Sequence, residues 1–312
     1  MTKRALFILN PVARRAPPID RLRAAIDGLA GWESSLELTQ ATGHATELAR
    51  EAAERGLDAV VACGGDGTAN EVANGLVGSQ TALAVVRGGT SNVWAKEVHI
   101  PRKLSDAVRV LADGEVRTID LGRASAAGGH PASGGASRYF LALAGVGFDA
   151  AIVREVHGGL KRRLGATAYA LHGLRRTLSY RETEADIRAN GDALSGSLYW
   201  LVLGNTRSYG GLINITDRAK VDDGRLDLVL LRRGGLHRLV WLGLWLLLRR
   251  HHQRAHVVSQ QIESLEITTP GLPVQLDGEY LGETPVHFEV APGALRVIVP
   301  RGLKSPLFAR SG

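Results

Sequence analysis

The stretch "CGGDGTANEVANGL", residues 63–76, sets one aspartate inside a glycine-rich turn directly before a helical pattern. The apolar residues ahead of it, "LDAVVA", predict a buried strand, and the glycines predict a tight turn at its end. Thr68 stands three residues before Glu71, which is the spacing of a capping box, so we expect a helix over residues 69–77. The segment therefore predicts a strand, a glycine turn and a helix N-terminus in succession.

Asp66 is the residue that a tight turn alone does not require. A helix N-terminus offers free N–H groups and a positive dipole end, and Gly64, Gly65 and Gly67 let a phosphate approach the backbone. Asp66 would repel a bare phosphate, but it suits a site with Mg²⁺ or with a hydroxyl that must lose a proton. An Asp-Gly turn without a ligand is the alternative. Neither "GK[ST]" nor "GxGxxG" marks this turn, so another kind of nucleotide site is indicated.

The first third of the chain alternates between short apolar strands and helical patterns, which predicts βαβ units and a parallel sheet. The expected strands are residues 5–10, 35–39, 57–65 and 81–86, and the expected helices are 19–29, 44–55, 69–77 and 105–111.

After residue 116 the pattern changes to strands with polar or glycine-rich joints, one of them expected over residues 137–146, which predicts a mainly antiparallel β domain. Residues 126–137 are expected to form a long flexible loop, and two helices interrupt the domain. The helices are expected near residues 161–178 and 236–250. The fold class is thus an α/β domain, residues 1–116, followed by a β-sandwich-like domain, residues 117–312.

The composition of the chain indicates where the protein works and which partners its charge suits. The chain has 312 residues, a formal net charge of +7 and one cysteine, so no intramolecular disulfide can form and a reducing compartment fits. The longest apolar run, residues 239–248, is far shorter than the roughly 20 residues of a membrane-spanning helix. The N-terminus does not read as a signal peptide. We therefore expect a cytoplasmic protein. Its positive charge alone fits a nucleic acid, an anionic membrane surface, a phosphorylated ligand or simply a solvated basic surface.

The motif residues resemble a known family. "GGDGTANEVANGL" resembles the signature of the diacylglycerol kinase catalytic domain, which bacterial lipid kinases share with sphingosine and ceramide kinases. "GGDGT" by itself also occurs in NAD kinases and is related to a phosphofructokinase motif, and the extension "NEVANGL" favours the lipid kinases. Further resemblances follow in family order at residues 10–11, 38–49, 87–101, 202–231 and 276–300.

The resemblance implies a nucleotide site built from several of these motifs. Asn10 belongs to "NPVAR", which lacks the glycine of the family's "NPxxG", and Thr39 stands where an adenosine or ribose contact is expected. In "RGGTSNVWAKEVHIP", Val93 replaces the usual aspartate and Lys96 the usual arginine. The residues expected to bind ATP are Asn10, Thr39, Gly64, Gly65, Asp66, Gly67, Thr68, Glu71, Thr90 and Asn92.

The segment "LDGEYL" by itself is a hairpin signal. The resemblance implies that Asp277 and Glu279 form the acidic pair that takes the proton of the acceptor hydroxyl. Side-chain chemistry does not rank the two, and the family pattern favours Glu279, with Asp277 in support. Asp66 would lie across the cleft, holding Mg²⁺ or sharing that work.

Two readings are open for "VDDGRL". It is a plain Asx turn, or, as the resemblance implies, a structural Mg²⁺ site with Asp223 as ligand and Lys220 and Arg225 contributing only backbone carbonyls. The histidine-rich "RRHHQRAHV" lacks zinc spacing and reads as a solvated basic face. Residues 235–254 read either as a core-facing helix or as one that lines a lipid pocket or lies at the membrane surface.

The sequence therefore predicts a lipid kinase that transfers the γ-phosphate of ATP, with Mg²⁺, to a hydroxyl of diacylglycerol or a related lipid. ATP is expected between the domains and the lipid tail in the second domain, with the last residues returning to pack on the first. We expect peripheral contact with the anionic inner face of the membrane and no binding of nucleic acid. The sequence leaves the oligomeric state open. The alternatives are an NAD kinase-like phosphotransferase, against which the "DDG" and "DGE" motifs argue, and a non-catalytic lipid- or nucleotide-binding regulator.

Overall fold

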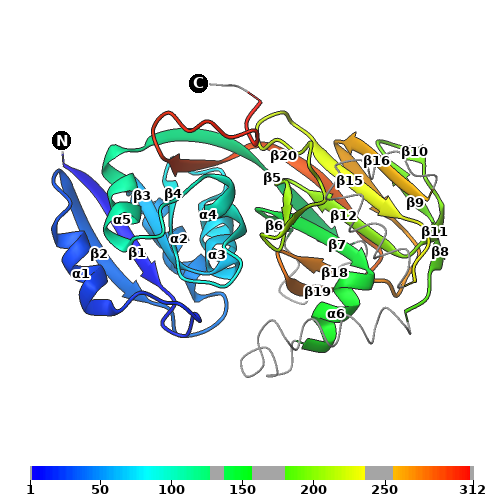
Figure 1. Cartoon of the computed structure of the whole chain (residues 1–312), viewed down its shortest axis with the longest axis horizontal. Helices are drawn as coiled ribbons and strands as arrows, with labels where there is room; N and C mark the ends of the chain where they lie inside the picture. The colour runs from blue at the N-terminus through cyan, green and yellow to red at the C-terminus, as the bar shows by residue number, and fades with distance from the viewer. Residues whose placement is uncertain (1, 127–136, 157–179, 236–255, 310–312) are drawn as a thin grey trace.

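The structure, a computed structural model, describes residues 2–126, 137–156, 180–235 and 256–309. These residues form two lobes that are bridged by long strands (Figure 1). Both helices expected near residues 161–178 and 236–250, and nearly all of the loop expected over 126–137, lie outside the described residues. Within them, no helix is both long and apolar enough to cross a membrane.

The first lobe is the expected parallel sheet with helices packed on it. Its strands lie in the order β2-β1-β3-β4 and all neighbours are parallel. Helix α2 packs on α3 and α1 on α5, and the residues of β3 are buried on both faces. The elements are β1 (Lys3–Leu9), α1 (Ile19–Asp27), β2 (Trp32–Leu38), α2 (His44–Glu54), β3 (Ala59–Gly64), α3 (Asp66–Leu76), β4 (Ala82–Arg87), α4 (Val93–Glu97) and α5 (Leu104–Asp113).

The second lobe is a sandwich of two mainly antiparallel sheets. One has the order β16-β15-β12-β7-β18-β19, and the other contains β10, β9, β17, β20, β5 and β6. An apolar core including Phe140, Leu228 and Phe288 lies between the two sheets. The elements are β5 (Glu115–Ala126), β6 (Arg138–Phe140), β7 (Leu143–Gly147), α6 (Phe148–Val156), β8 (Thr183–Ala185), β9 (Ile187–Ala189), β10 (Asp192–Ala193), β11 (Gly196–Leu198), β12 (Trp200–Gly204), β13 (Ser208–Tyr209), β14 (Ile213–Asn214), β15 (Leu226–Leu231), β16 (Val257–Ile262), β17 (Ser264–Ile267), β18 (Pro273–Leu276), β19 (Glu279–Glu283) and β20 (Val286–Val299).

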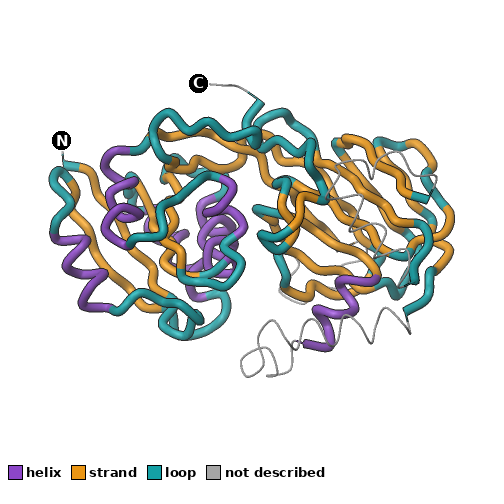
Figure 2. The backbone as a smooth tube through the Cα atoms, viewed as in Figure 1, coloured by secondary structure: helices purple, strands orange, loops and turns teal. Residues whose placement is uncertain are grey.

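Strands β5 and β20 run through both lobes and make one continuous sheet of them (Figure 2). Strand β20 pairs with β17 of the second lobe at its start, and at its far end Val297 pairs in parallel with Leu83 of β4. After β20 the chain returns to the first lobe, where Leu303, Leu307 and Phe308 join its core. Because β5 and β20 belong to both lobes, the boundary between residues 116 and 117 stays a prediction.

The strand expected over residues 137–146 is instead two strands, β6 and β7. Leu141 and Ala142 interrupt it because their backbone N–H groups donate to the carboxylate of Asp277 rather than to a neighbouring strand. Helices α4 and α6 were not expected from the sequence. Helix α4 has only five residues, and α6 begins directly after β7 with no turn residues between them.

Candidate active site

Two pairs of consecutive glycines, one at the end of β3 and one after β4, pack against each other. The N–H of Gly88 donates to the carbonyl of Gly64 over 2.7 Å. A Cβ atom on Gly89 would stand 2.5 Å from the Cα of Gly65, closer than real Cβ atoms come to a backbone. The glycines of "GGDGT" are therefore required by this backbone contact as well as by any phosphate.

Asp66 is the first residue of α3, and its carboxylate is held by the next element along the sheet edge. Its Oδ1 accepts a hydrogen bond from the backbone N–H of Val93, the first residue of α4, over 2.5 Å. Burial raises the pKa of Asp66, and backbone hydrogen bonds, that from Val93 foremost, oppose the rise. The carboxylate is thus fixed in orientation beside the glycine turn.

The capping box expected from Thr68 and Glu71 is wrong. Helix α3 begins at Asp66, with Gly65 as its N-cap and no side-chain cap, so Thr68 already lies inside the first turn. The Thr68 hydroxyl instead accepts from Nδ2 of Asn10 over 3.2 Å. The Glu71 carboxylate accepts from the N–H of Ala45 over 3.2 Å, at the start of α2. The two side chains that were expected to cap the helix are thus hydrogen-bonded to residues from distant segments of the chain.

The residues expected to bind a nucleotide lie along one edge of the parallel sheet. Asn10 follows β1, Thr39 follows β2, and the glycine turns follow β3 and β4. Asn92 is buried; its side chain accepts from the N–H of Gly89 over 2.8 Å and donates to its carbonyl over 2.7 Å. Thr90, between them, is exposed. Because open α/β sheets bind ligands at the carboxyl ends of their strands, this edge suits a nucleotide.

The Asp277 carboxylate occupies the turn of the β18–β19 hairpin and is saturated by donors. The residue has φ +48°, as an Asp-Gly hairpin turn requires. Its Oδ1 accepts from the N–H groups of Ala142 and Leu143 over 2.9 and 2.8 Å. Its Oδ2 accepts from the N–H of Leu141 over 2.8 Å and from Nδ2 of Asn70 over 2.6 Å. Burial raises the pKa of Asp277 to about 6, against the effect of the three backbone donors. Asp277 is therefore a structural centre of the site.

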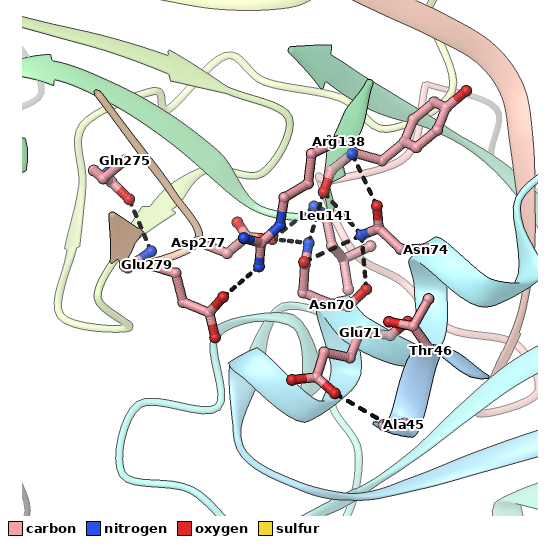
Figure 3. Close-up of polar contacts among 12 residues, drawn as sticks. Ala45, Thr46, Asn70, Glu71, Asn74, Arg138, Leu141, Gln275, Asp277 and Glu279 are labelled. Carbon is pink, nitrogen blue, oxygen red and sulfur yellow. Dashed lines mark hydrogen bonds and ion pairs between the residues drawn. The ribbon is translucent and has the colours of Figure 1, made fainter. Parts of the chain in front are cut away.

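Glu279 begins β19 and reaches from the second lobe to the start of α3. Its Oε1 lies 3.0 Å from the place where a Cβ atom on Gly67 would stand. Its carboxylate also pairs with Arg138, the first residue of β6 (Figure 3). The side chain is 25% exposed, so it is accessible to a substrate. The "DGE" turn thus presents one carboxylate to the "GGDGT" turn of the other lobe.

Two asparagines of α3 join the lobes, and sequence reasoning missed both. Nδ2 of Asn70 donates to the carbonyl of Tyr139 over 3.0 Å in addition to Asp277. Asn74 donates to the same carbonyl over 3.0 Å and accepts from the Tyr139 N–H over 2.9 Å. Their spacing of one helical turn was the available signal, because it puts both amides on one face of α3.

The turn "VDDGRL" forms a separate acidic group. Asp223 accepts from the N–H of Arg225 over 3.1 Å, as in an Asx turn, and shares Nε2 of Gln261 with Asp227, 3.3 Å from each carboxylate. Burial raises the pKa of Asp223. Burial, with the charges of Asp223 and Asp217, raises the pKa of Asp227 to about 6, against the hydrogen bond from Gln261. Among the described residues, no three His, Cys, Asp or Glu side chains converge as metal ligands. Lys220 lies in the same turn. The predicted metal role of Asp223, Lys220 and Arg225 is thus untested by the side-chain geometry.

Comparison with known proteins identifies the family. A family model described as "Diacylglycerol kinase catalytic domain" matches residues 4–124. A second family model, described as "YegS C-terminal NAD kinase beta sandwich-like domain", matches residues 142–299. The diacylglycerol kinase of Bacillus subtilis (strain 168) is 30% identical over 305 residues, 96% of this chain and 97% of its own length. The chain belongs to the diacylglycerol kinase family. The resemblance in the motifs is confirmed, and with it the enzyme class, a lipid kinase.

Another relative and a solved structure match this chain along nearly their whole length. The diacylglycerol kinase of Staphylococcus carnosus (strain TM300) is 27% identical over 98% of both chains. A crystal structure from Bacillus anthracis str. Sterne, provisionally described as a diacylglycerol kinase, superimposes with a TM-score of 0.74 over 97% of this chain and 99% of its own, at 22% identity. That structure supports the two-lobe fold of the family, which confirms the expected fold class.

Most of the acidic and turn residues predicted from the family lie together at the start of α3. The turn with Asp223 lies apart from them. Glu279 of the second lobe stands against Gly67, the neighbour of Asp66 at the start of α3, and Asp277 is hydrogen-bonded to Asn70 of the same helix. Asn10 and Thr68 lie beside this group, and the Asn10 side chain donates a hydrogen bond to the Thr68 hydroxyl. The turn with Asp223 forms its own group at the start of β15.

Proposed function

We propose that this lipid kinase transfers the γ-phosphate of ATP to a hydroxyl of diacylglycerol or a related lipid, at the junction of Asp66, Gly67 and Glu279. One observation carries the proposal. A carboxylate from the second lobe, Glu279, stands against the helix N-terminus that follows a strand and a glycine turn in the first. Phosphoryl transfer needs this combination of a phosphate cradle and a group that accepts a proton.

ATP binding is the role of the carboxyl edge of the parallel sheet. The N-terminus of α3 presents N–H groups and a positive dipole end to the phosphates. Asn10, Thr39, Thr90 and Asn92 lie along the same edge and are proposed to contact the nucleoside and the phosphates. The fixed orientation of Asn92, bonded twice to Gly89, supports a site formed before the nucleotide arrives.

Glu279 is proposed as the general base. The acceptor oxygen attacks the γ-phosphorus, the bond from that phosphorus to the β–γ bridging oxygen breaks, and the hydroxyl proton passes to the Glu279 carboxylate. Asp277 supports this step from behind, because its four hydrogen bonds fix the turn that carries Glu279. The difference in hydrogen bonding supports Glu279 rather than Asp277 as the proposed base.

Magnesium fits the oxygen chemistry of these residues. Asp66 would hold the ion next to the phosphates, and Mg²⁺ when bound neutralises charge on the β- and γ-phosphate oxygens. Asp223, with the backbone carbonyls of Lys220 and Arg225, is proposed as a second, structural position. The close approach of Asp223 and Asp227 around one amide supports a cation there, because two carboxylates repel each other.

The lipid is proposed to bind on the second lobe. An apolar cluster there includes Phe148, Tyr199 and Trp200, and Leu212 is 89% exposed. The exposed Leu212 and the net charge of +7 support transient contact with the anionic cytoplasmic face of a membrane, whereas the apolar cluster itself is buried.

A lipid panel tests the proposal. The full chain is incubated with Mg-ATP and, in separate reactions, diacylglycerol, ceramide, sphingosine, monoacylglycerol and NAD, and the products are read by mass spectrometry. Phosphorylated diacylglycerol or a related lipid, with no phosphorylated NAD, is the expected result. Phosphorylated NAD alone would favour the NAD kinase alternative, and ATP binding without any product would favour a non-catalytic regulator.

A further inference from the structure

The proposed base is not free in this structure, because the Glu279 carboxylate is paired with Arg138. The guanidinium of Arg138 donates to Oε2 of Glu279, while Oε1 faces Gly67. A carboxylate engaged by an arginine has fewer lone pairs for a substrate proton. Arg138 must therefore move from Glu279, at least in part, before the reaction.

The backbone of Arg138 is anchored while its side chain extends into the site. The next residue, Tyr139, is hydrogen-bonded to α3. Its N–H donates to the Asn74 side chain, and its carbonyl accepts from the side chains of Asn70 and Asn74. Figure 3 shows the Arg138 side chain running from this anchor to Glu279. The Arg138 side chain is 28% exposed, so its end has room to change partner.

The surroundings of Arg138 are strongly acidic. Burial raises the pKa of Glu71 on α3, the charge of Glu279 adds to that rise, and the charge of Arg138 opposes it. Burial likewise raises the pKa of Asp277, and the charge of Asp66 adds to the rise. A γ-phosphate entering between the lobes meets these carboxylates, and a cation on the second-lobe side would offset their repulsion together with Mg²⁺ and the helix N-terminus of the first lobe.

We propose that Arg138 is a catalytic residue that exchanges the Glu279 carboxylate for the γ-phosphate of ATP. The exchange places the planar fork on the phosphoryl oxygens, where charge collects during transfer, and leaves Glu279 free to accept the hydroxyl proton. This inference rests on the proposed function, since it assumes ATP at the turn before α3. A γ-phosphate competes well for arginine because it carries more charge than a carboxylate and offers three oxygens.

The alternative is that the Arg138–Glu279 pair is a static tie between β6 and β19. The two readings differ in their response to the γ-phosphate. A static tie affects ATP and ADP alike, because it shapes the site as a whole. A ligand of the γ-phosphate affects only the nucleotide that has one.

The test measures affinities of the full chain, with excess Mg²⁺, for ADP and for the β,γ-imido analogue of ATP by calorimetry. For Arg138→Met we expect affinity for the analogue to fall by about tenfold and affinity for ADP to change by less than about twofold. Arg138→Lys keeps the charge but not the fork and should recover part of the loss. The ADP affinity shows in the same experiment that each variant is folded.

Glu279→Gln provides the second arm. Removing the competing carboxylate charge should tighten analogue binding by about threefold or more, and Arg138→Met in the same chain should abolish that gain. Arg123→Met is the matched control, because Arg123 pairs with Glu289 between β5 and β20 in the same lobe. It should leave both affinities unchanged.

Three outcomes would overturn the inference: equal losses for ADP and the analogue in Arg138→Met, no loss for either, or weaker analogue binding in Glu279→Gln. If the wild-type chain binds neither nucleotide, the proposed function fails together with this inference. If the wild-type chain binds both nucleotides and Arg138→Met changes neither affinity, only the inference about Arg138 fails.

Discussion

Nδ2 of Asn70 donates a 2.6 Å hydrogen bond to Oδ2 of Asp277, a residue 207 positions away in the chain and in the other lobe. The bond joins the helix of the "GGDGT" motif directly to the turn of the "DGE" motif. Because Asp66 lies one turn before Asn70, and Glu279 two residues after Asp277, this bond helps to set where Glu279 stands relative to the start of α3. The two motifs are thus joined by a direct hydrogen bond between the lobes.

Asp277→Asn should destabilise the fold. An amide cannot accept from all four donors, and its own NH₂ would face the backbone N–H groups of Leu141 or of Ala142 and Leu143. Leaving buried donors unpaired costs about 2–4 kcal/mol in the free energy of unfolding, measured by urea denaturation. Asp192→Asn, at an exposed position on β10, is the control and should change it by less than about 0.5 kcal/mol. Equal stability of the two variants would mean that Asp277 is not the structural centre described here.

Gly89→Ala should disturb the nucleotide turn. Its new Cβ atom would stand 2.5 Å from the Cα of Gly65, and neither backbone can yield without moving the start of α3. We expect a loss of about 1–3 kcal/mol in the free energy of unfolding, together with weaker ATP binding. Gly28→Ala is the matched control, because a Cβ there would be 3.6 Å from its nearest neighbour, the carbonyl oxygen of Ala25. An unaltered melting temperature in Gly89→Ala would show that the two glycine turns are not in contact.

The buried Asp149 should make stability depend on pH. It is 3% exposed and accepts from Gln275 over 3.0 Å and from Tyr209 over 3.3 Å. Burial raises its pKa to about 6, above the ordinary value of 3.8, so the folded state holds its proton at higher pH than the unfolded state. Its contribution to stability is therefore full below the unfolded pKa and is lost as pH rises through about 6.

Asp149→Asn tests this sign. Between pH 4 and pH 6, a window bounded by the two pKa values, the wild-type free energy of unfolding should fall relative to that of the variant as pH rises. The measurement is urea denaturation of both chains at several pH values. Parallel curves for the two chains would contradict the prediction, and a relative rise would reverse the sign.

The turn with Asp223 should respond to Mg²⁺ if it holds the proposed structural ion. A ligand that binds only the folded state stabilises it by about 2.7 kcal/mol at a concentration one hundred times its dissociation constant. Added Mg²⁺ should therefore raise the melting temperature of the wild-type chain and raise that of Asp223→Asn much less. Asp186→Asn, in the β8–β9 connection, is the control and should keep the full response. The same response in Asp223→Asn and in the wild type would remove Asp223 from the proposed ligands.

The sequence predicted the first lobe well because its signals are local. Apolar runs such as residues 59–64 can only be buried strands, and the helices between them have regular spacing. The hairpin at Asp277 was predicted for the same reason, since an Asp-Gly pair favours the backbone that the turn adopts. The family motifs then indicated which polar residues would gather.

What the sequence did not predict depends on contacts between distant segments. The capping box at Thr68 and Glu71 was a sound local pattern, but Asn10 and Ala45 occupy those side chains in the folded chain. The break at residues 141–142 exists because Asp277 draws their N–H groups out of the strand. The asparagines of "NEVAN" read as ordinary helix residues until their partner Tyr139 is placed beside them.

The turnover of Glu279→Gln tests the central claim most directly, which is that the Glu279 carboxylate performs the proton transfer at the "GGDGT" turn. The rate of γ-phosphate transfer to diacylglycerol in mixed micelles is measured at saturating Mg-ATP and lipid for the wild type and for Glu279→Gln. We predict a fall in kcat of about 10²–10⁴-fold, typical of a lost general base, with an unchanged free energy of unfolding. A folded Glu279→Gln enzyme with wild-type kcat would contradict the account.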